Sequence, residues 1–218
     1  MPFFISFAPL RIEKMHLAVT HYCRISGNCI YKDGQQLFEA KDRTFDQFSE
    51  DAYRHFHLNY PKFHKMDNLS KLGLLASDIL LKNNKLEHTI RPEQIGVILS
   101  NQSSSLDTDV KYAGMVKSGV ASPAVFVYSL PNIVIGEICI RNGIKGENTF
   151  FISDRYDIPS QVNYINRLFE NEVFDACIGG WLELMGERYE AFLYLAMKAE
   201  KQQLPHTVET IKKLYQNL

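Results

Sequence analysis

The chain has 218 residues, 45% of them hydrophobic, and its 24 basic side chains nearly cancel its 25 acidic ones. This length and apolar content are enough to bury the core of a single domain over residues 1–218, which excludes an intrinsically disordered chain. Neither sign of charge is gathered into a long run, so we expect no nucleic acid and no anionic membrane surface as a partner.

The N-terminal segment, residues 1–14, has an apolar patch but neither a preceding basic residue nor a small-residue cleavage pattern. It therefore lacks the features of a secretory signal and is expected to form a core or pairing strand. No apolar run approaches the roughly 20 residues that a membrane-spanning helix needs, so we expect no membrane span.

Residues 15–31 are predicted to form a strand, a turn around Gly27 and Asn28, and a second short extended piece. The polar residues 32–64 contain aromatic side chains without a clear period. We therefore predict mostly loop with short helical turns for that segment.

An amphipathic helix is predicted from Asp67, because apolar residues recur at three- and four-residue spacing over residues 69–80. Asp67 or Asn68 is placed to cap its first turn. Residues 96–100 (GVILS) form a short apolar run, which is typical of a strand buried on both faces of a parallel sheet.

Residues 106–117 have the spacing of a second helix, and residues 122–132 are predicted to be extended around Pro123. A third helix follows, with Pro131 suited to its first turn and Gly143 suited to its C-terminal cap. Because this helix is apolar on nearly all sides, we expect it to be buried.

The rest of the chain continues the alternation of strands and helices. The predicted elements are a strand at 149–153, a helix at 159–170, a strand at 174–184, a strand or a helix at 189–199, and a closing helix at 206–218. This order predicts a layered α/β domain with a mixed, largely parallel sheet and helices on both faces.

The four cysteines match neither a CxxC redox pair nor a zinc ligand set; they are Cys23, Cys29, Cys139 and Cys177. Cys139 and Cys177 lie in apolar segments, where a thiol usually behaves as a small buried hydrophobe. Together with the missing signal features, the cysteines favour the reducing cytoplasm.

His55, His57 and His64 raise a metal hypothesis, since HxH places two imidazoles on one face of a strand. Cysteine ligands are missing nearby and acids are only scattered, so solvated or packing histidines are favoured, and we expect neither a metal nor another cofactor.

Two polar turns are candidate sites. The loop at residues 101–107 follows a predicted parallel strand, where backbone amides and hydroxyls can hold an anion, although capping by Ser105 or Asp107 is the favoured role. The turn at residues 154–157 places Arg155 and Tyr156 between two aspartates, which could transfer protons, although an ion-paired turn that caps the next helix is favoured.

Four segments in order carry a family resemblance: FHKMDNLSKLGLLASDIL (63–80), IGVILSN (95–101), SPAVFVYSLPNIVIGEICIRNGIKGEN (122–148) and FDACIGGWLE (174–183). Together they resemble the N-terminal half of β-ketoacyl synthases, the condensing enzymes of the thiolase fold. The third segment is the most specific, with its Leu-Pro-Asn and its Gly-x-x-Gly-x-Asn turn.

In that family a strand leads from the glycine turn to a nucleophilic cysteine in a Thr-Ala-Cys-x-Ser context. Counted from Gly146, the nucleophile position falls on Arg155 or Tyr156, and neither side chain can form a thioester. The catalytic histidines and lysine of the family lie in a C-terminal half that has no counterpart in this sequence. The resemblance therefore implies no catalytic residues here.

The implied function is that of a catalytically inactive partner or assembly subunit in fatty-acid-like or polyketide-like biosynthesis, for example of the aryl polyene type. The implied partners are a second copy or a full-length ketosynthase, and acyl carrier protein. In the family, two copies of the strand before the nucleophile pair across the dimer axis. The corresponding residues here are Thr149, Phe150, Phe151, Ile152 and Ser153.

An alternative is a protein that binds acyl thioesters of acyl carrier protein or coenzyme A, or hydrolyses them weakly. Its acyl pocket would be formed by Phe126, Tyr128 and Asn132.

Overall fold

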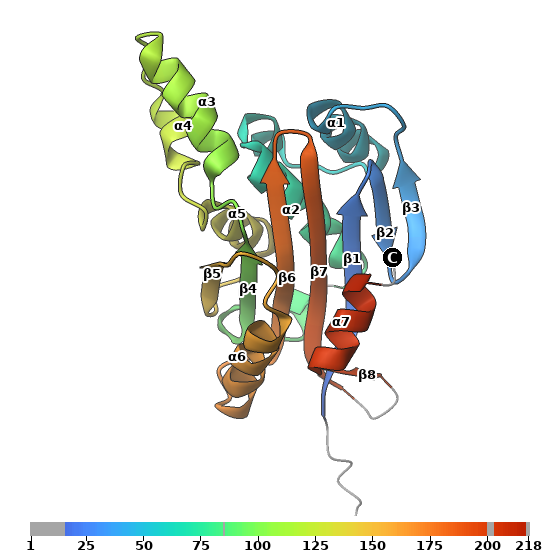
Figure 1. The fold of residues 1–218 in the computed structure, drawn as a ribbon. Helices are drawn as coiled ribbons and strands as arrows, with labels where there is room; N and C mark the ends of the chain where they lie inside the picture. The colour runs from blue at the N-terminus through green and yellow to red at the C-terminus, as the bar shows by residue number, and fades with distance from the viewer. Residues whose placement is uncertain (1–15, 85, 200–202, 217–218) are drawn as a thin grey trace, which may run out of the picture.

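The computed structural model describes residues 16–84, 86–199 and 203–216, which form one mixed β-sheet with helices on both faces (Figure 1). The strands are β1 (His16–Ser26), β2 (Cys29–Lys32), β3 (Gln35–Glu39), β4 (Ile95–Asn101), β5 (Asn148–Ile152), β6 (Ala176–Met185), β7 (Arg188–Ala199) and β8 (Leu204–Pro205). The predicted layered α/β domain is confirmed. The strand expected within residues 1–14 lies outside the described residues.

The sheet has the order β3-β2-β1-β7-β6-β4-β5, and β8 pairs with β1 outside this order. Only β4 makes parallel pairs among the described strands, with β5 on one side and β6 on the other. The expectation of a largely parallel sheet is therefore wrong. The reason is that β6 and β7 form a long antiparallel hairpin around Gly186, which has a positive φ of 60°.

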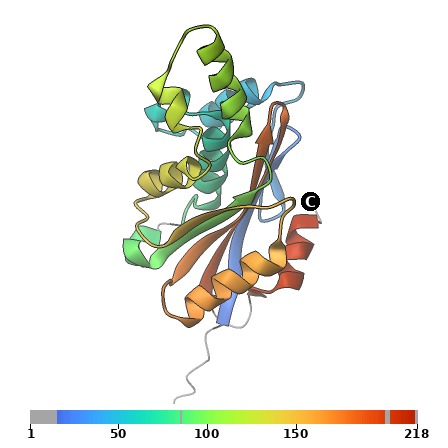
Figure 2. The same ribbon diagram turned by 60° about the vertical axis from the view of Figure 1, so that its left-hand side comes forward.

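The α-helices are α1 (Phe45–His55), α2 (Asn68–Leu80), α3 (Leu106–Lys117), α4 (Pro123–Val127), α5 (Ile133–Asn142), α6 (Ile158–Glu170) and α7 (Val208–Gln216). Helices α1, α2 and α5 cover one face of the sheet, and α6 and α7 cover the other (Figure 2). All seven residues of β4 are buried, with Val97 and Leu99 in one core and Ile98 in the other. Within the described ranges, no helix is both long and apolar enough to span a bilayer.

The prediction of mostly loop for residues 32–64 is wrong, because this segment holds β3 and α1. Helix α1 begins with a capping box: Thr44 Oγ1 accepts from the Gln47 N–H at 3.4 Å, and Gln47 Oε1 accepts from the Thr44 N–H at 3.2 Å. Its apolar side chains Phe45, Phe48 and Ala52 are completely buried.

The prediction of an extended segment around Pro123 is also wrong. Ser122 Oγ accepts from the Val125 N–H at 3.4 Å and Pro123 lies in the first turn, so the residues form α4. Pro131 precedes α5 instead of lying in its first turn, while Gly143 ends that helix with a φ of 65°, as expected. The cap predicted at Asp67 is confirmed by its bond to the Ser70 N–H at 3.0 Å.

Helices α3 and α4 form an arm that extends away from the sheet (Figure 1). More than half of the exposed large apolar side chains in the described residues lie on these helices or in the loops that follow them: Leu106, Val110, Val116, Val120, Phe126, Val127 and Leu130. The arm is fastened at its base, where Thr108 Oγ1 donates to Asp67 Oδ2 at 2.8 Å and the Gly186 N–H donates to Asp107 Oδ1 at 2.9 Å.

The close approach of α2 to α5 depends on a glycine and gives a test of the packing. A Cβ on Gly73 would lie 2.4 Å from Val134 Cγ2 and 3.0 Å from Leu182 Cδ2, whereas a Cβ on Gly136 of α5 meets no atom within 4 Å. Gly73→Ala should lower the free energy of unfolding by about 1–2 kcal/mol through overpacking. Gly136→Ala, the matched control, should raise it by roughly 0.5–1 kcal/mol. Urea unfolding measures both, and equal effects would contradict this packing.

Candidate functional site

The turn between β5 and α6 holds the residues at the expected nucleophile position. The Ser153 N–H donates to the Asn101 carbonyl at 2.9 Å, and Ser153 Oγ donates to the Arg155 carbonyl at 2.7 Å. Asp157 accepts from the Ser160 N–H at 3.2 Å, and its hydrogen bonds to the Ser160 side chain and to that N–H hold the pKa of the carboxyl below its usual value. The favoured helix-capping role is confirmed for Asp157, whereas the Arg155 side chain is exposed.

Tyr156 points into the protein from this turn. Its hydroxyl donates to Gln161 Oε1 at 2.7 Å, and its ring stacks on Trp181 with centroids 5.6 Å apart. Burial raises the pKa of the phenol well above its usual value, so the hydroxyl stays protonated and serves as a hydrogen-bond donor.

A buried polar network lies under the turn and was missed by the sequence analysis. Gln161 Nε2 donates to the Gly180 carbonyl at 3.0 Å, and the Tyr194 hydroxyl lies 3.4 Å from Gln161 Oε1. His206 Nε2 lies 3.2 Å from the same hydroxyl, and its Nδ1 lies 2.7 Å from Asn166 Oδ1. Gln161 falls on the apolar stripe of α6, and this polar residue on a buried face was the available signal.

A cleft of about 350 Å³ opens beside this network. It lies where the parallel strands β4 and β5 end and α6 begins, the region where open α/β sheets bind ligands. Its lining comprises Ser100, Phe151, Ile152, Ser153, Asp157, Ser160, Gln161 and Tyr164. This lining offers hydroxyls, an amide, a capping carboxylate and apolar surface, with no thiol or imidazole among it.

The cysteines lie elsewhere. Cys177 is completely buried on β6 in the core beneath α6, and burial raises the pKa of its thiol. Burial also raises the pKa of the half-buried Cys139 to about 11. Both thiols are therefore protonated and weakly nucleophilic at neutral pH.

In the loop at residues 101–107, two backbone amides that could hold an anion are already bound to a carboxylate of the protein, that of Glu183. Glu183 Oε2 of β6 accepts from the Gln102 N–H at 2.7 Å and from the Ser103 N–H at 3.2 Å. Side-chain capping of α3 by Ser105 or Asp107 is wrong: Ser105 Oγ donates to the Ser129 carbonyl at 2.7 Å, and Asp107 fastens the arm.

The three acyl-pocket candidates do not line the cleft. Phe126 is 56% exposed on the arm and contacts the Tyr112 ring, with centroids 5.6 Å apart. The Tyr128 hydroxyl donates to the buried Glu137 at 3.0 Å, and Asn132 is exposed at the start of α5.

Two of the three histidines in the metal hypothesis make other contacts. His64 Nδ1 lies 3.1 Å from Glu50 Oε1, and the His55 ring packs on Phe38 with centroids 4.8 Å apart. Within the part of the chain that the structure describes, no three His, Cys, Asp or Glu side chains gather in a way that could hold a metal ion.

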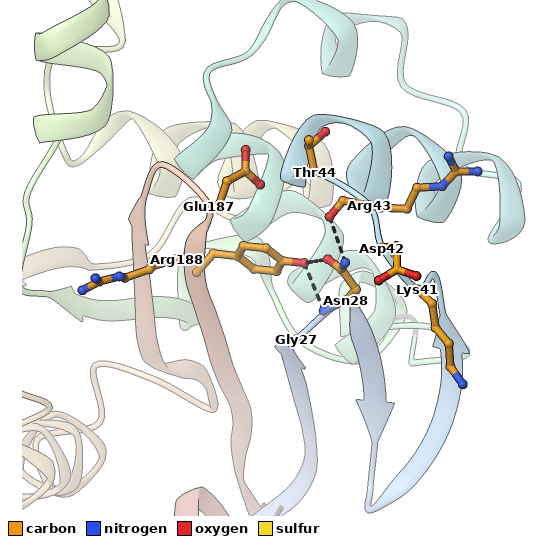
Figure 3. A pocket seen from close by; sticks show the side chains of 9 residues that line it. Gly27, Asn28, Lys41, Asp42, Arg43, Thr44, Glu187 and Arg188 are labelled. Atoms are coloured by element: carbon orange, nitrogen blue, oxygen red, sulfur yellow. Dashed lines mark hydrogen bonds between the residues drawn. The ribbon is translucent and has the colours of Figure 1, made fainter.

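A wider cavity, of about 840 Å³, lies among the β1–β2 turn, residues 41–44 and the β6–β7 turn (Figure 3). Its polar groups bind one another: the Tyr189 hydroxyl bonds the Asn28 side chain, whose Nδ2 donates to the Arg43 carbonyl at 2.9 Å. The Arg43 and Arg188 side chains extend away from the cavity in opposite directions (Figure 3). We interpret these hydrogen bonds as structural contacts that hold the start of α1 against the β1–β2 turn and the β6–β7 turn.

The network makes stability depend on pH. Burial lowers the pKa of His206 to about 4, so between its usual value of 6.5 and about 4 the unfolded chain binds a proton that the folded chain does not. The free energy of unfolding should therefore fall as the pH is lowered through this window, by about 2 kcal/mol between pH 7 and pH 5. His206→Gln should remove that decrease. Urea unfolding at both pH values measures it, and the same slope in wild type and variant would contradict the assignment.

Neither a protein-family model nor any curated protein sequence matches this chain. Solved structures match its fold. The ishigamide ketosynthase/chain length factor matches with a TM-score of 0.65 at 18% identity, over 87% of this chain and 64% of that one. A type II polyketide synthase acyl-carrier protein in complex with its ketosynthase, AntDE:AntF, matches with a TM-score of 0.59 at 16% identity, over 87% and 63%.

A third match is the ketosynthase ApeO in complex with its chain length factor ApeC from Xenorhabdus doucetiae, with a TM-score of 0.57 at 11% identity, over 93% of this chain and 91% of that one. In the first two matches this chain covers less than two thirds of the length of the matched protein chain. At these identities the likeness is one of fold, and the expected fold is confirmed: the chain folds like a β-ketoacyl synthase.

Proposed function

We propose that this protein is a non-catalytic subunit that pairs with a full-length β-ketoacyl synthase in fatty-acid-like or polyketide-like biosynthesis of the aryl polyene type. The observation that carries the proposal is the exposed apolar edge of the sheet at β5. The proposal places the protein in the cytoplasm, with acyl carrier protein as a further partner of the assembly.

Strand β5 pairs with β4 along one edge, and no described strand pairs with its other edge. Phe151 is 39% exposed and Ile152 is 51% exposed. An apolar edge strand with free backbone donors and acceptors is prone to pair with another chain. The exposed apolar side chains of the arm supply a further surface that a partner can cover.

The chemistry of the cleft supports a binding role. The turn carries no thiol that could accept an acyl group, because its central residues are Arg155 and Tyr156. The Arg155 side chain is exposed, and the Tyr156 hydroxyl is hydrogen-bonded in the buried network. Acyl transfer needs a nucleophile, a base and an oxyanion hole within mutual reach. Among the residues that line the cleft, no histidine or thiol lies beside the serine hydroxyls, and the one carboxylate, that of Asp157, accepts from the Ser160 N–H as a helix cap.

The comparisons support a short partner subunit. The match to the ApeO–ApeC complex covers nearly all of both chains, so a chain of about this length occurs in a ketosynthase and chain length factor assembly. Pairing through β5 is compatible with such a heterodimer and with two copies of this chain, because antiparallel pairing of equivalent strands gives a closed two-fold dimer.

The β5 interface can be tested with one charge. Phe151→Asp should convert the dimer or heterodimer to monomer or aggregate, because a carboxylate at the apolar edge would have to be desolvated on pairing. Size-exclusion chromatography with light scattering measures the assembly. Val173→Asp is the matched control, since Val173 is 37% exposed and precedes β6, a strand that β4 separates from β5. An unchanged assembly in the Phe151 variant, with circular dichroism showing a folded chain, would rule out this interface.

The absence of catalysis can be tested directly. After incubation with an acyl-coenzyme A or an acylated carrier protein, intact mass spectrometry should show no acyl adduct and no released product, because the buried Cys177 thiol is protonated. A full-length ketosynthase serves as the positive control. A covalent adduct or turnover would contradict the proposal and favour the alternative thioester-binding enzyme.

A further inference from the structure

A groove of about 690 Å³ lies at the opposite end of β4 from the cleft. The C-terminal ends of α2 and α5 and the start of β4 form its walls. Its apolar floor consists of the partly exposed Phe56, Leu58 and Leu81, which lie above the buried Ile79, Leu86, Ile95 and Ile144. This volume and lining are typical of sites that bind small molecules. The groove is independent of the proposed partner interface.

The rim of the groove is cationic. Lys82, Arg141 and Lys145 line it, whereas Asp78 is the only acid among its lining residues. Asp78 is already used, because Arg141 Nη2 lies 2.9 Å from Asp78 Oδ2. Because the charges of Arg141 and Asp78 cancel, the net positive charge of the rim comes from Lys82 and Lys145.

The two lysines differ in how they are held. Lys82 Nζ lies 5.2 Å from the centroid of the Phe56 ring, which keeps the ammonium beside the apolar floor. Lys145 is exposed and follows the C-terminal cap of α5, and within the described ranges no acid lies in salt-bridge contact with it. Both ammonium groups can therefore accept the head group of an anionic ligand.

We propose that the groove binds a linear amphiphile with an anionic head group, of the medium-chain fatty carboxylate class. The apolar floor takes the hydrocarbon tail, and the two lysines hold the carboxylate at the rim. An uncharged ligand would leave the lysines without a counter-charge, and a small anion would leave the partly exposed Phe56, Leu58 and Leu81 in contact with water. An amphiphile satisfies both parts of the site.

Isothermal titration calorimetry with decanoate, below its micelle-forming concentration, tests the proposal. Decanoate should bind saturably to one site, and octanoate should bind about fifteenfold more weakly, because each buried methylene contributes about fourfold. Lys82→Glu combined with Lys145→Glu should weaken decanoate binding at least tenfold and leave decanol binding nearly unchanged. Lys117→Glu, an exposed charge reversal on the arm, should have no effect.

Methyl NMR locates the ligand. Decanoate should shift the signals of Ile79 and Ile144, which line the groove, and leave that of Ile152 beside the cleft unchanged. The proposal is overturned if decanoate does not bind saturably, if the double charge reversal binds it as tightly as wild type, or if the shifts appear at Ile152 instead. Circular dichroism of the variants shows whether they remain folded.

Discussion

The parallel pairing of β4 with both β5 and β6 is the constraint on which the rest of the structure depends. Because β4 is buried along its whole length, its neighbours must lie on both sides and helices must cover both faces. The carboxyl end of β4 then places the cleft beside α6, and its other end borders the groove. The same pairing puts β5 at the edge of the sheet, where its second side faces outward.

The protein uses its own carboxylates where a ligand would otherwise bind backbone amides. Glu183 receives the amides of the loop after β4, and Glu187 accepts from the Phe45 N–H at 2.7 Å at the start of α1. Both are charge-assisted hydrogen bonds, which are stronger than bonds between neutral groups. The buried network of Gln161, Tyr194 and His206 fills the space beneath the turn in the same way. These contacts hold the loop after β4, the start of α1 and the turn before α6 in place.

Local patterns predicted the elements whose burial has a simple period. The helix starting at Asp67, the buried strand at β4 and the capped turn before α6 all follow from spacing and capping residues. Helix α1 was missed although the Thr44 and Gln47 capping box marks its start, because aromatic residues in the surrounding segment obscured the period. The direction of β7 could not be predicted, since a continuous apolar run is compatible with a strand or a helix until its partner is known.

The site was predictable only in outline. The turn and its cap are local, whereas the network joins α6, β6, β7 and residue 206, which meet only in the folded chain. The resemblance to ketosynthases rests on the order of four segments along the chain, which residue spacing within one element cannot reveal. The likeness of fold to solved ketosynthases agrees with that resemblance.

Purification of the tagged chain from its native cell, with identification of the proteins that accompany it, tests the central claim most directly. The account predicts that a full-length β-ketoacyl synthase is recovered in about equal amount and is lost in the Phe151→Asp variant. Recovery of the chain without any ketosynthase would contradict it.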